Sequence, residues 1–227
     1  MNKKVLADPA ALIAQAIDDF GKLLVRLREQ QSELTVLLTG GTLGIEFVGA
    51  LGRSSIELQG VTFIFGDERY VDVDHPDRNE RQAQDVFPEL EANLLRYPQP
   101  SGGLDQDAEL FNRRISELLG PVEMPRKQID LTILGMGPDG HIASLFPGRL
   151  HGKGWIVSES DSPKPPSQRL SFSYEALSSS ERVWFLVSGS AKADSLRKVF
   201  AGELPAAKVQ GLGETTWYLD SEISDAL

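Results

Sequence analysis

Short, predominantly apolar runs recur along the chain, and each ends at a glycine-rich or polar segment. Four have the length of a strand: residues 34–39 (LTVLLT), 61–65 (VTFIF), 130–135 (DLTILG) and 182–189 (RVWFLVSG). Continuous apolar runs, without alternation of apolar and polar positions, are typical of strands buried on both faces of a parallel sheet. We therefore expect these four segments to form the centre of one sheet.

Between these runs, apolar residues recur at the spacing of an amphipathic helix. The first helix is expected after Asp8, which suits the N-cap, with Pro9 at the first helical position. Strands that alternate with helices predict an α/β fold with a doubly wound, mainly parallel sheet and helices on both faces, as in Rossmann-like proteins. No linker interrupts the pattern, so a single domain is expected over residues 1–227.

All four predicted strands end in polar or glycine-rich sequence. Ligands of open α/β sheets bind beyond the carboxyl ends of the strands, where such segments converge. We expect one site there, and four segments would contribute to it: residues 39–42, 67–69, 139–141 and 188–192.

Composition narrows the classes of ligand. With 33 acidic and 23 basic residues the formal net charge is -10, which disfavours nucleic acid and anionic membranes as partners. The absence of cysteine excludes thiolate chemistry, and three histidines leave little room for a metal site, so neither metal nor cofactor is expected. Asp8 and Pro9 interrupt any secretory segment and no run has the length of a membrane span, which predicts a soluble, cytoplasmic protein.

The stretch LGMGPDGHIASLFPG fits the dinucleotide pattern G-x-G-x-x-G from Gly135 onward, and Glu159 lies near the usual position of a ribose-binding acid. However, Asp139 would repel a pyrophosphate, and Pro138 offers no N–H group to bind one. A loop that presents His141 is the better interpretation, because histidine is suited to proton transfer near neutral pH.

Two segments suit an anion such as a phosphate. Gly40, Gly41 and Thr42 join a strand to a helix, and glycines there let free backbone N–H groups approach a phosphate; the alternative is a tight turn with Thr42 as N-cap. The lysine of a nucleotide P-loop is missing, so a monophosphate is favoured over ATP. Lys192 in the first turn of a helix opposes the helix dipole unless an anion binds nearby.

Other charged segments allow two interpretations each. Asp67 to Arg69 follow a strand end and either face the pocket or form a solvated loop, whereas His75 is expected to be an exposed loop histidine. The Pro/Ser-rich residues 158–168 are expected to form a loop that could close as a lid. Arg169, which follows them, either reaches the same anion or merely flanks a strand.

Together these segments resemble the 6-phosphogluconolactonases, of the superfamily shared with glucosamine-6-phosphate deaminases. The resemblance runs through Gly40-Gly41, GDER, the 134–148 stretch, KPP..R, V.F.VSGSAKA and the terminal WYLD, and so covers nearly the whole chain. It implies a Rossmann-like fold and hydrolysis of 6-phospho-D-glucono-1,5-lactone to 6-phospho-D-gluconate in the oxidative pentose phosphate pathway, without a metal. The expected protein is a monomer or a small homo-oligomer.

The resemblance also implies roles for individual residues. Asp67 and His141 match the family's proposed catalytic pair. Groups around the substrate phosphate and sugar are matched by Gly40, Gly41, Thr42, Arg69, Arg169 and Lys192.

The chemistry of lactone hydrolysis is consistent with these roles. We expect His141 to deprotonate the attacking water, with Asp139 or Asp67 orienting the imidazole and one of them delivering a proton to the leaving ring oxygen. Ser144 is conceivable as a nucleophile but lacks the nucleophile-elbow pattern, so direct attack by water is preferred.

Departures from the family pattern concern two segments. Residues 39–44 read TGGTLG where members often have SGGSTP, and residues 78–81 read RNER where members often have SNYG. Deaminases carry a glutamate five positions after the histidine, where this chain has Phe146. A deaminase-like isomerase and a non-catalytic sugar-phosphate sensor are therefore the weaker alternatives.

Overall fold

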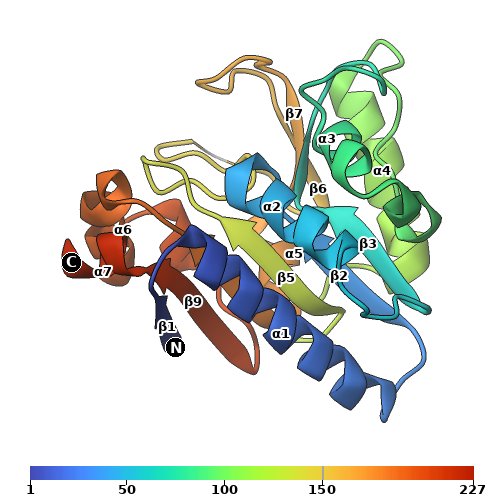
Figure 1. Cartoon of the computed structure of the whole chain (residues 1–227). Helices are drawn as coiled ribbons and strands as arrows, with labels where there is room; N and C mark the ends of the chain where they lie inside the picture. The colour runs from blue at the N-terminus through green and yellow to red at the C-terminus, as the bar shows by residue number, and fades with distance from the viewer. Residues whose placement is uncertain (150) are drawn as a thin grey trace.

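One parallel sheet organises the computed structural model, which describes residues 1–149 and 151–227 (Figure 1). Every neighbouring pair of its strands runs parallel. Across the sheet the strands lie in the order β1 (Asn2–Leu6), β9 (Glu214–Asp220), β8 (Ser180–Val187), β5 (Ile129–Gly135), β2 (Leu34–Leu38) and β3 (Val61–Phe65).

The four strands predicted from apolar runs are confirmed as β2, β3, β5 and β8. All five residues of β2 are buried, as expected for a strand covered on both faces. The chain proceeds from β2 to β3 in one direction, and from β5 through β8 to β9 in the other. The order therefore reverses between β2 and β5, and the crevice at the carboxyl ends of these two strands is where such sheets bind ligands.

Helices flank this sheet. In Figure 1, α1 (Pro9–Arg28) and α2 (Gly41–Gly52) lie in front of it and α5 (Tyr174–Ser178) lies behind. The Asp8 carboxylate accepts the Ala11 N–H at 2.8 Å, which confirms the predicted N-cap of α1. The remaining helices are α3 (Asn79–Val86), α4 (Leu104–Leu119), α6 (Ala193–Phe200) and α7 (Ser221–Asp225), with 3-10 turns η1 (Pro88–Asn93), η2 (Ser190–Lys192) and η3 (Pro205–Lys208). In the described part of the chain, no helix is both long and apolar enough to cross a membrane.

A second, antiparallel sheet was not predicted. It consists of β4 (Asp67–Arg69), β7 (Arg169–Phe172) and β6 (Ile156–Glu159), and α4 packs against β6. The expected loop 158–168 is therefore shorter than predicted, because its first two residues belong to β6. Strands of three or four residues are too short to show a period of two, and pairing with neighbours distant in sequence stabilises them.

Glu68, between two residues predicted for the site, faces the protein interior and anchors α3. Its Oε1 accepts the N–H groups of Arg69 at 2.7 Å and Asn79 at 2.8 Å, and its Oε2 accepts that of Glu80 at 2.9 Å. The N-cap residue Arg78 makes no side-chain cap, so Glu68 satisfies the free N–H groups at the start of this helix. Burial, together with the neighbouring Glu80 carboxylate, raises the pKa of Glu68 to about 8.

The unusual segment 78–81 forms a buried ionic cluster around this anchor. Arg78 is 1% exposed and its Nη2 lies 2.9 Å from Oε2 of Glu80. Oε1 of Glu80 accepts the Tyr97 N–H at 2.6 Å, so the loop before α4 is tied to the same group. The arginine and glutamate that depart from the family pattern thus hold α3 in place from inside.

We expect Glu68→Ala to lower the free energy of unfolding by about 2–4 kcal/mol, because it leaves the buried N–H groups of Asn79 and Glu80 and the partly buried N–H of Arg69 without an acceptor. The midpoint of urea unfolding measures this loss. Glu117→Ala on the exposed face of α4 is the control and should change stability by less than about 0.5 kcal/mol. Equal midpoints for the two variants would contradict the anchoring role.

Candidate active site

A cavity of about 520 Å³ opens at the carboxyl ends of β2 and β5. Each of the four segments expected to converge contributes to its wall, so the predicted meeting of strand ends is observed. The polar and glycine residues that line it include Thr39, Gly40, Gly41, Thr42, Asp67, Arg69, Asn79, Gly137, His141, Ser144, Lys164, Arg169, Ser188 and Lys192.

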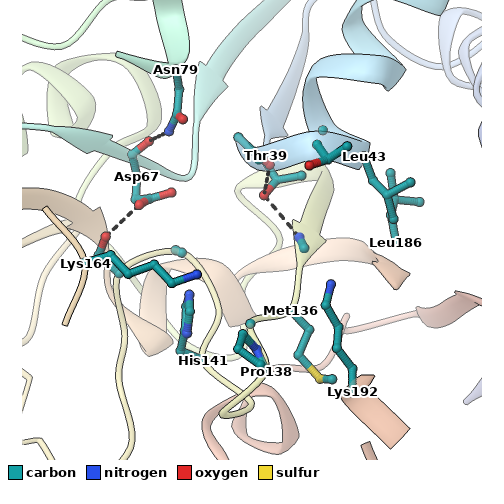
Figure 2. Close-up of a pocket in the computed structure, with 18 of the residues that line it drawn as sticks. Thr39, Leu43, Asp67, Asn79, Met136, Pro138, His141, Lys164, Leu186 and Lys192 are labelled. Carbon is teal, nitrogen blue, oxygen red and sulfur yellow. Dashed lines mark hydrogen bonds between the residues drawn. The ribbon is translucent and has the colours of Figure 1, made fainter. Parts of the chain in front are cut away.

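His141 faces this cavity (Figure 2), and Asp139 holds its ring. Nδ1 forms a short hydrogen bond with Oδ1 of Asp139, so Nε2 is the nitrogen left to act on a ligand. Burial alone would raise the pKa of Asp139, but the hydrogen bond and charge of His141 lower it overall. Asp139 itself does not line the cavity, which makes it a partner of the imidazole.

The glycines around His141 have a different purpose from those of a dinucleotide fold. A Cβ on Gly137 would lie 2.0 Å from Cε1 of the imidazole, and Gly140 has a φ of +79°. No helix begins within residues 136–149 to present N–H groups to a pyrophosphate. The loop geometry therefore supports the interpretation that it presents a histidine.

Asp67 also lines the cavity but does not orient the imidazole. Its Oδ2 accepts the Ser144 hydroxyl at 2.6 Å, and its backbone carbonyl accepts Nδ2 of Asn79 at 2.8 Å. Of the two carboxylates considered from the sequence, Asp139 is the one that contacts His141. Ser144 is buried and its hydroxyl proton is used by Asp67, which does not suit a nucleophile.

The glycine loop leads directly into α2. Gly40 is the N-cap and the helix begins at Gly41, so the alternative in which Thr42 caps the helix is wrong. A Cβ on Gly40 would lie 2.0 Å from Oδ1 of Asn79, which explains a glycine at this position. With no side-chain cap, the N-terminus of α2 offers backbone N–H groups to an anion in the cavity.

Lys192 lies across the cavity from this loop (Figure 2). It ends η2 and directly precedes α6, so it stands one residue before the helix in which it was expected. Burial lowers its pKa, and Lys164 adds to that effect while Asp220 opposes it. A lysine desolvated in this way is a strong partner for an anionic group.

Arg69 and Arg169 pair directly across β4 and β7, and both line the cavity. Arg169 is buried, and burial lowers its pKa, with the charge of Arg69 acting in the same direction. Like charges on opposite positions of neighbouring strands repel each other, and an anion between them removes that cost. From the sequence, Arg169 was expected either to reach the anion or merely to flank a strand. The structure shows it both at the start of β7 and at the border of the cavity.

Phe146 packs against the catalytic candidate. Its ring centroid lies 4.6 Å from that of His141, and the Arg149 guanidinium lies 5.6 Å from the Phe146 ring centroid. The position that holds a glutamate in deaminases is thus apolar here. Among the described residues, no three His, Asp or Glu side chains are grouped so that they could hold a metal ion.

Lys164 was missed by the sequence analysis, whereas His75 was correctly placed outside the site. Lys164 lies in the expected lid and lines the cavity. In the sequence only the KPP..R motif distinguished the segment around Lys164, and nothing in that motif indicates that the segment reaches the ends of the central strands.

His75 is a half-exposed loop residue whose Nδ1 accepts the Asp77 N–H at 3.1 Å.

Comparisons with known proteins agree with this architecture. A family model described as glucosamine-6-phosphate isomerases/6-phosphogluconolactonase matches residues 7–217. A 6-phosphogluconolactonase of Mycobacterium leprae is 31% identical in an alignment 238 positions long. The alignment covers 96% of this chain and 95% of the relative.

Solved structures show the same fold. The 6-phosphogluconolactonase of Thermotoga maritima has a TM-score of 0.86 at 26% identity, over 97% of this chain and 99% of that one. A monomeric glucosamine-6-phosphate deaminase has a TM-score of 0.83 at 18% identity over the full length of both chains, a likeness of fold alone. The chain belongs to the glucosamine-6-phosphate isomerase/6-phosphogluconolactonase family.

Proposed function

We propose that this protein hydrolyses 6-phospho-D-glucono-1,5-lactone to 6-phospho-D-gluconate in the cytoplasm. The observation that carries the proposal is His141, held through Nδ1 by Asp139 and packed against Phe146, in a cavity bordered by four cationic side chains. This arrangement combines a base with a grip for an anionic substrate. The names of the Mycobacterium leprae and Thermotoga maritima relatives point to the same activity.

The cationic groups bind the phosphate. The N–H groups at the start of α2 and the partly desolvated ammonium of Lys192 face the cavity from opposite sides, and Arg69 and Arg169 also line it. Together they supply a local positive field that a chain of net charge -10 otherwise lacks. Fixing the phosphate orients the lactone ring relative to His141.

The imidazole carries the proton transfers. Nε2 of His141 accepts a proton from water as the water oxygen bonds to the lactone carbonyl carbon, and the carbonyl electrons move onto oxygen. When the tetrahedral intermediate collapses, the bond from carbon to ring oxygen breaks and the imidazolium donates its proton to that oxygen. The carboxylic acid left at C1 then loses its proton to solvent, which is the proton released overall. Asp139 stabilises the imidazolium between these steps, while Asp67 faces the substrate as an acceptor for a sugar hydroxyl.

Phe146 argues against the deaminase alternative. Aldose–ketose ring opening in that branch uses a glutamate at this position, and here an apolar ring occupies it. A deaminase shares the fold of this chain, so the fold does not decide the reaction and this side chain does. A sugar-phosphate sensor would have no need of the His141–Asp139 pair.

Proton release from freshly generated 6-phosphogluconolactone tests the proposal. The wild-type protein should accelerate release over the spontaneous rate, and His141→Ala should lower kcat by about 10²–10⁴-fold, because general base catalysis is lost. Its affinity for 6-phosphogluconate, measured by calorimetry, should stay close to that of the wild type, since the phosphate groups remain.

His75→Ala is the matched control, because this histidine is half-exposed and lies outside the cavity. It should retain full activity. Proton release that is no faster with the wild-type protein than in buffer would contradict the lactonase proposal. An unchanged kcat in His141→Ala would show that another residue is the base.

The lowered pKa of Lys192 predicts how binding changes with pH. Above about pH 8 a phosphate monoester is already a dianion, so further changes in affinity come from the protein. Lys192 binds the phosphate only when protonated and loses its proton at a lower pH than an ordinary lysine, so affinity for 6-phosphogluconate should fall as the pH rises above about 8, before an ordinary lysine would lose its charge. Lys192→Arg, which stays charged, should hold its affinity. Parallel curves for the two proteins, measured by calorimetry, would contradict this role.

A further inference from the structure

The connection between β6 and β7 brings one cation over the cavity. In Figure 1 the two strands form an arm that projects beyond the main sheet, and Lys164 lies in the segment that joins them. Figure 2 shows its side chain extending across the cavity towards His141, whereas Lys192 enters from the other side. The two lysines thus serve different parts of the cavity.

Backbone contacts hold this segment around Lys164. The Arg169 guanidinium donates from Nη2 to the Lys164 carbonyl at 3.1 Å and from Nε to the Pro166 carbonyl at 2.7 Å. The Ser162 N–H donates to the Ser167 carbonyl at 2.9 Å, which closes the turn. Ordering an exposed lysine on a flexible loop costs conformational entropy when a ligand binds. These hydrogen bonds order the loop in advance and so lower that cost.

The substrate separates its two negative centres in the same way as the cavity separates its two lysines. The phosphate of the lactone is on C6, and the carbonyl that becomes negatively charged is at C1, on the other side of the ring oxygen. A phosphate bound between α2 and Lys192 would leave C1 facing the side of the cavity where His141 and Lys164 lie.

We propose that Lys164 is a catalytic residue that stabilises the oxyanion formed at C1, with Arg169 as the positioning residue that holds its loop. The assignment rests on the proposed function. As water attacks and its proton passes to Nε2 of His141, the carbonyl electrons form an alkoxide that the Lys164 ammonium pairs with. The same ammonium then faces the C1 carboxylate of the product, and it neither gains nor loses a proton in the cycle.

Replacing Lys164 with methionine keeps the length of the side chain and removes its charge. Lys164→Met should lower kcat for lactone hydrolysis by about 10²-fold, the usual effect of losing one oxyanion partner. Lys164→Arg should recover much of this loss. Lys153→Met, an exposed lysine on the stretch before β6 and outside the cavity, is the matched control and should keep wild-type kcat.

Two equilibrium probes locate the ammonium independently of turnover. Calorimetry with 6-phosphogluconate, which has the C1 carboxylate, should show binding to Lys164→Met weakened by about fivefold, the effect of one partly exposed ion pair. Glucose 6-phosphate has the phosphate without the carboxylate and should bind both proteins equally. Equal weakening for both probes would make Lys164 a phosphate ligand and overturn the proposal.

The kinetic outcomes separate this inference from the proposed function. An active wild type with an equally active Lys164→Met overturns the role of Lys164 alone. A wild type that does not accelerate lactone hydrolysis overturns the proposed function, and the catalytic role of Lys164 with it.

Discussion

The buried carboxyl group of Glu68 is the contact on which the geometry of the site depends. It binds the N–H groups at the start of α3 and so fixes Asn79, whose side chain reaches the backbone carbonyl of Asp67 and lies against Gly40. The end of β2 and the end of β3 are thereby held at one distance from each other. A group with no part in the chemistry sets the width of the cavity, which is why its burial is tolerated despite the cost of desolvating a carboxyl group.

The cavity is preorganised for an anion, and in the free protein this arrangement costs electrostatic free energy, because cationic side chains are buried close to one another. Burial lowers the pKa values of both Lys192 and Arg169, and each has a cation of like sign nearby, Lys164 and Arg69 respectively. In the proposed mechanism a bound phosphate and a developing oxyanion compensate these charges, so part of the binding free energy would be relief of repulsion. Because the donors are fixed by strand pairing and by carbonyl contacts, little reorganisation is needed when charge develops at the substrate.

The sequence predicted the elements that are locally encoded and missed those fixed by distant contacts. Long apolar runs revealed β2, β3, β5 and β8, and the rule that ligands bind at strand ends brought His141, Asp67, Arg69 and Lys192 together correctly. Glu68 was indistinguishable from its neighbours in GDER, since only the position of α3, eleven residues on, turns it inward. The short strands β4, β6 and β7 and the reach of Lys164 depend on antiparallel pairing that leaves no periodic signal.

Phe146 shows how one fold separates two reactions. A base that deprotonates water must be neutral before it acts, and a second carboxylate beside His141 would favour the imidazolium. Asp139 contacts only Nδ1 of the ring, and the aromatic ring of Phe146 covers another side without adding negative charge. Asp139 is therefore the anionic side chain hydrogen-bonded to the imidazole, the partner that the proposed mechanism requires. A glutamate in place of Phe146 would supply a second partner and suit an acid that opens a sugar ring. Under the proposed function, the choice between acid and base would be made by the side chain that packs against the imidazole, because a deaminase has the same fold.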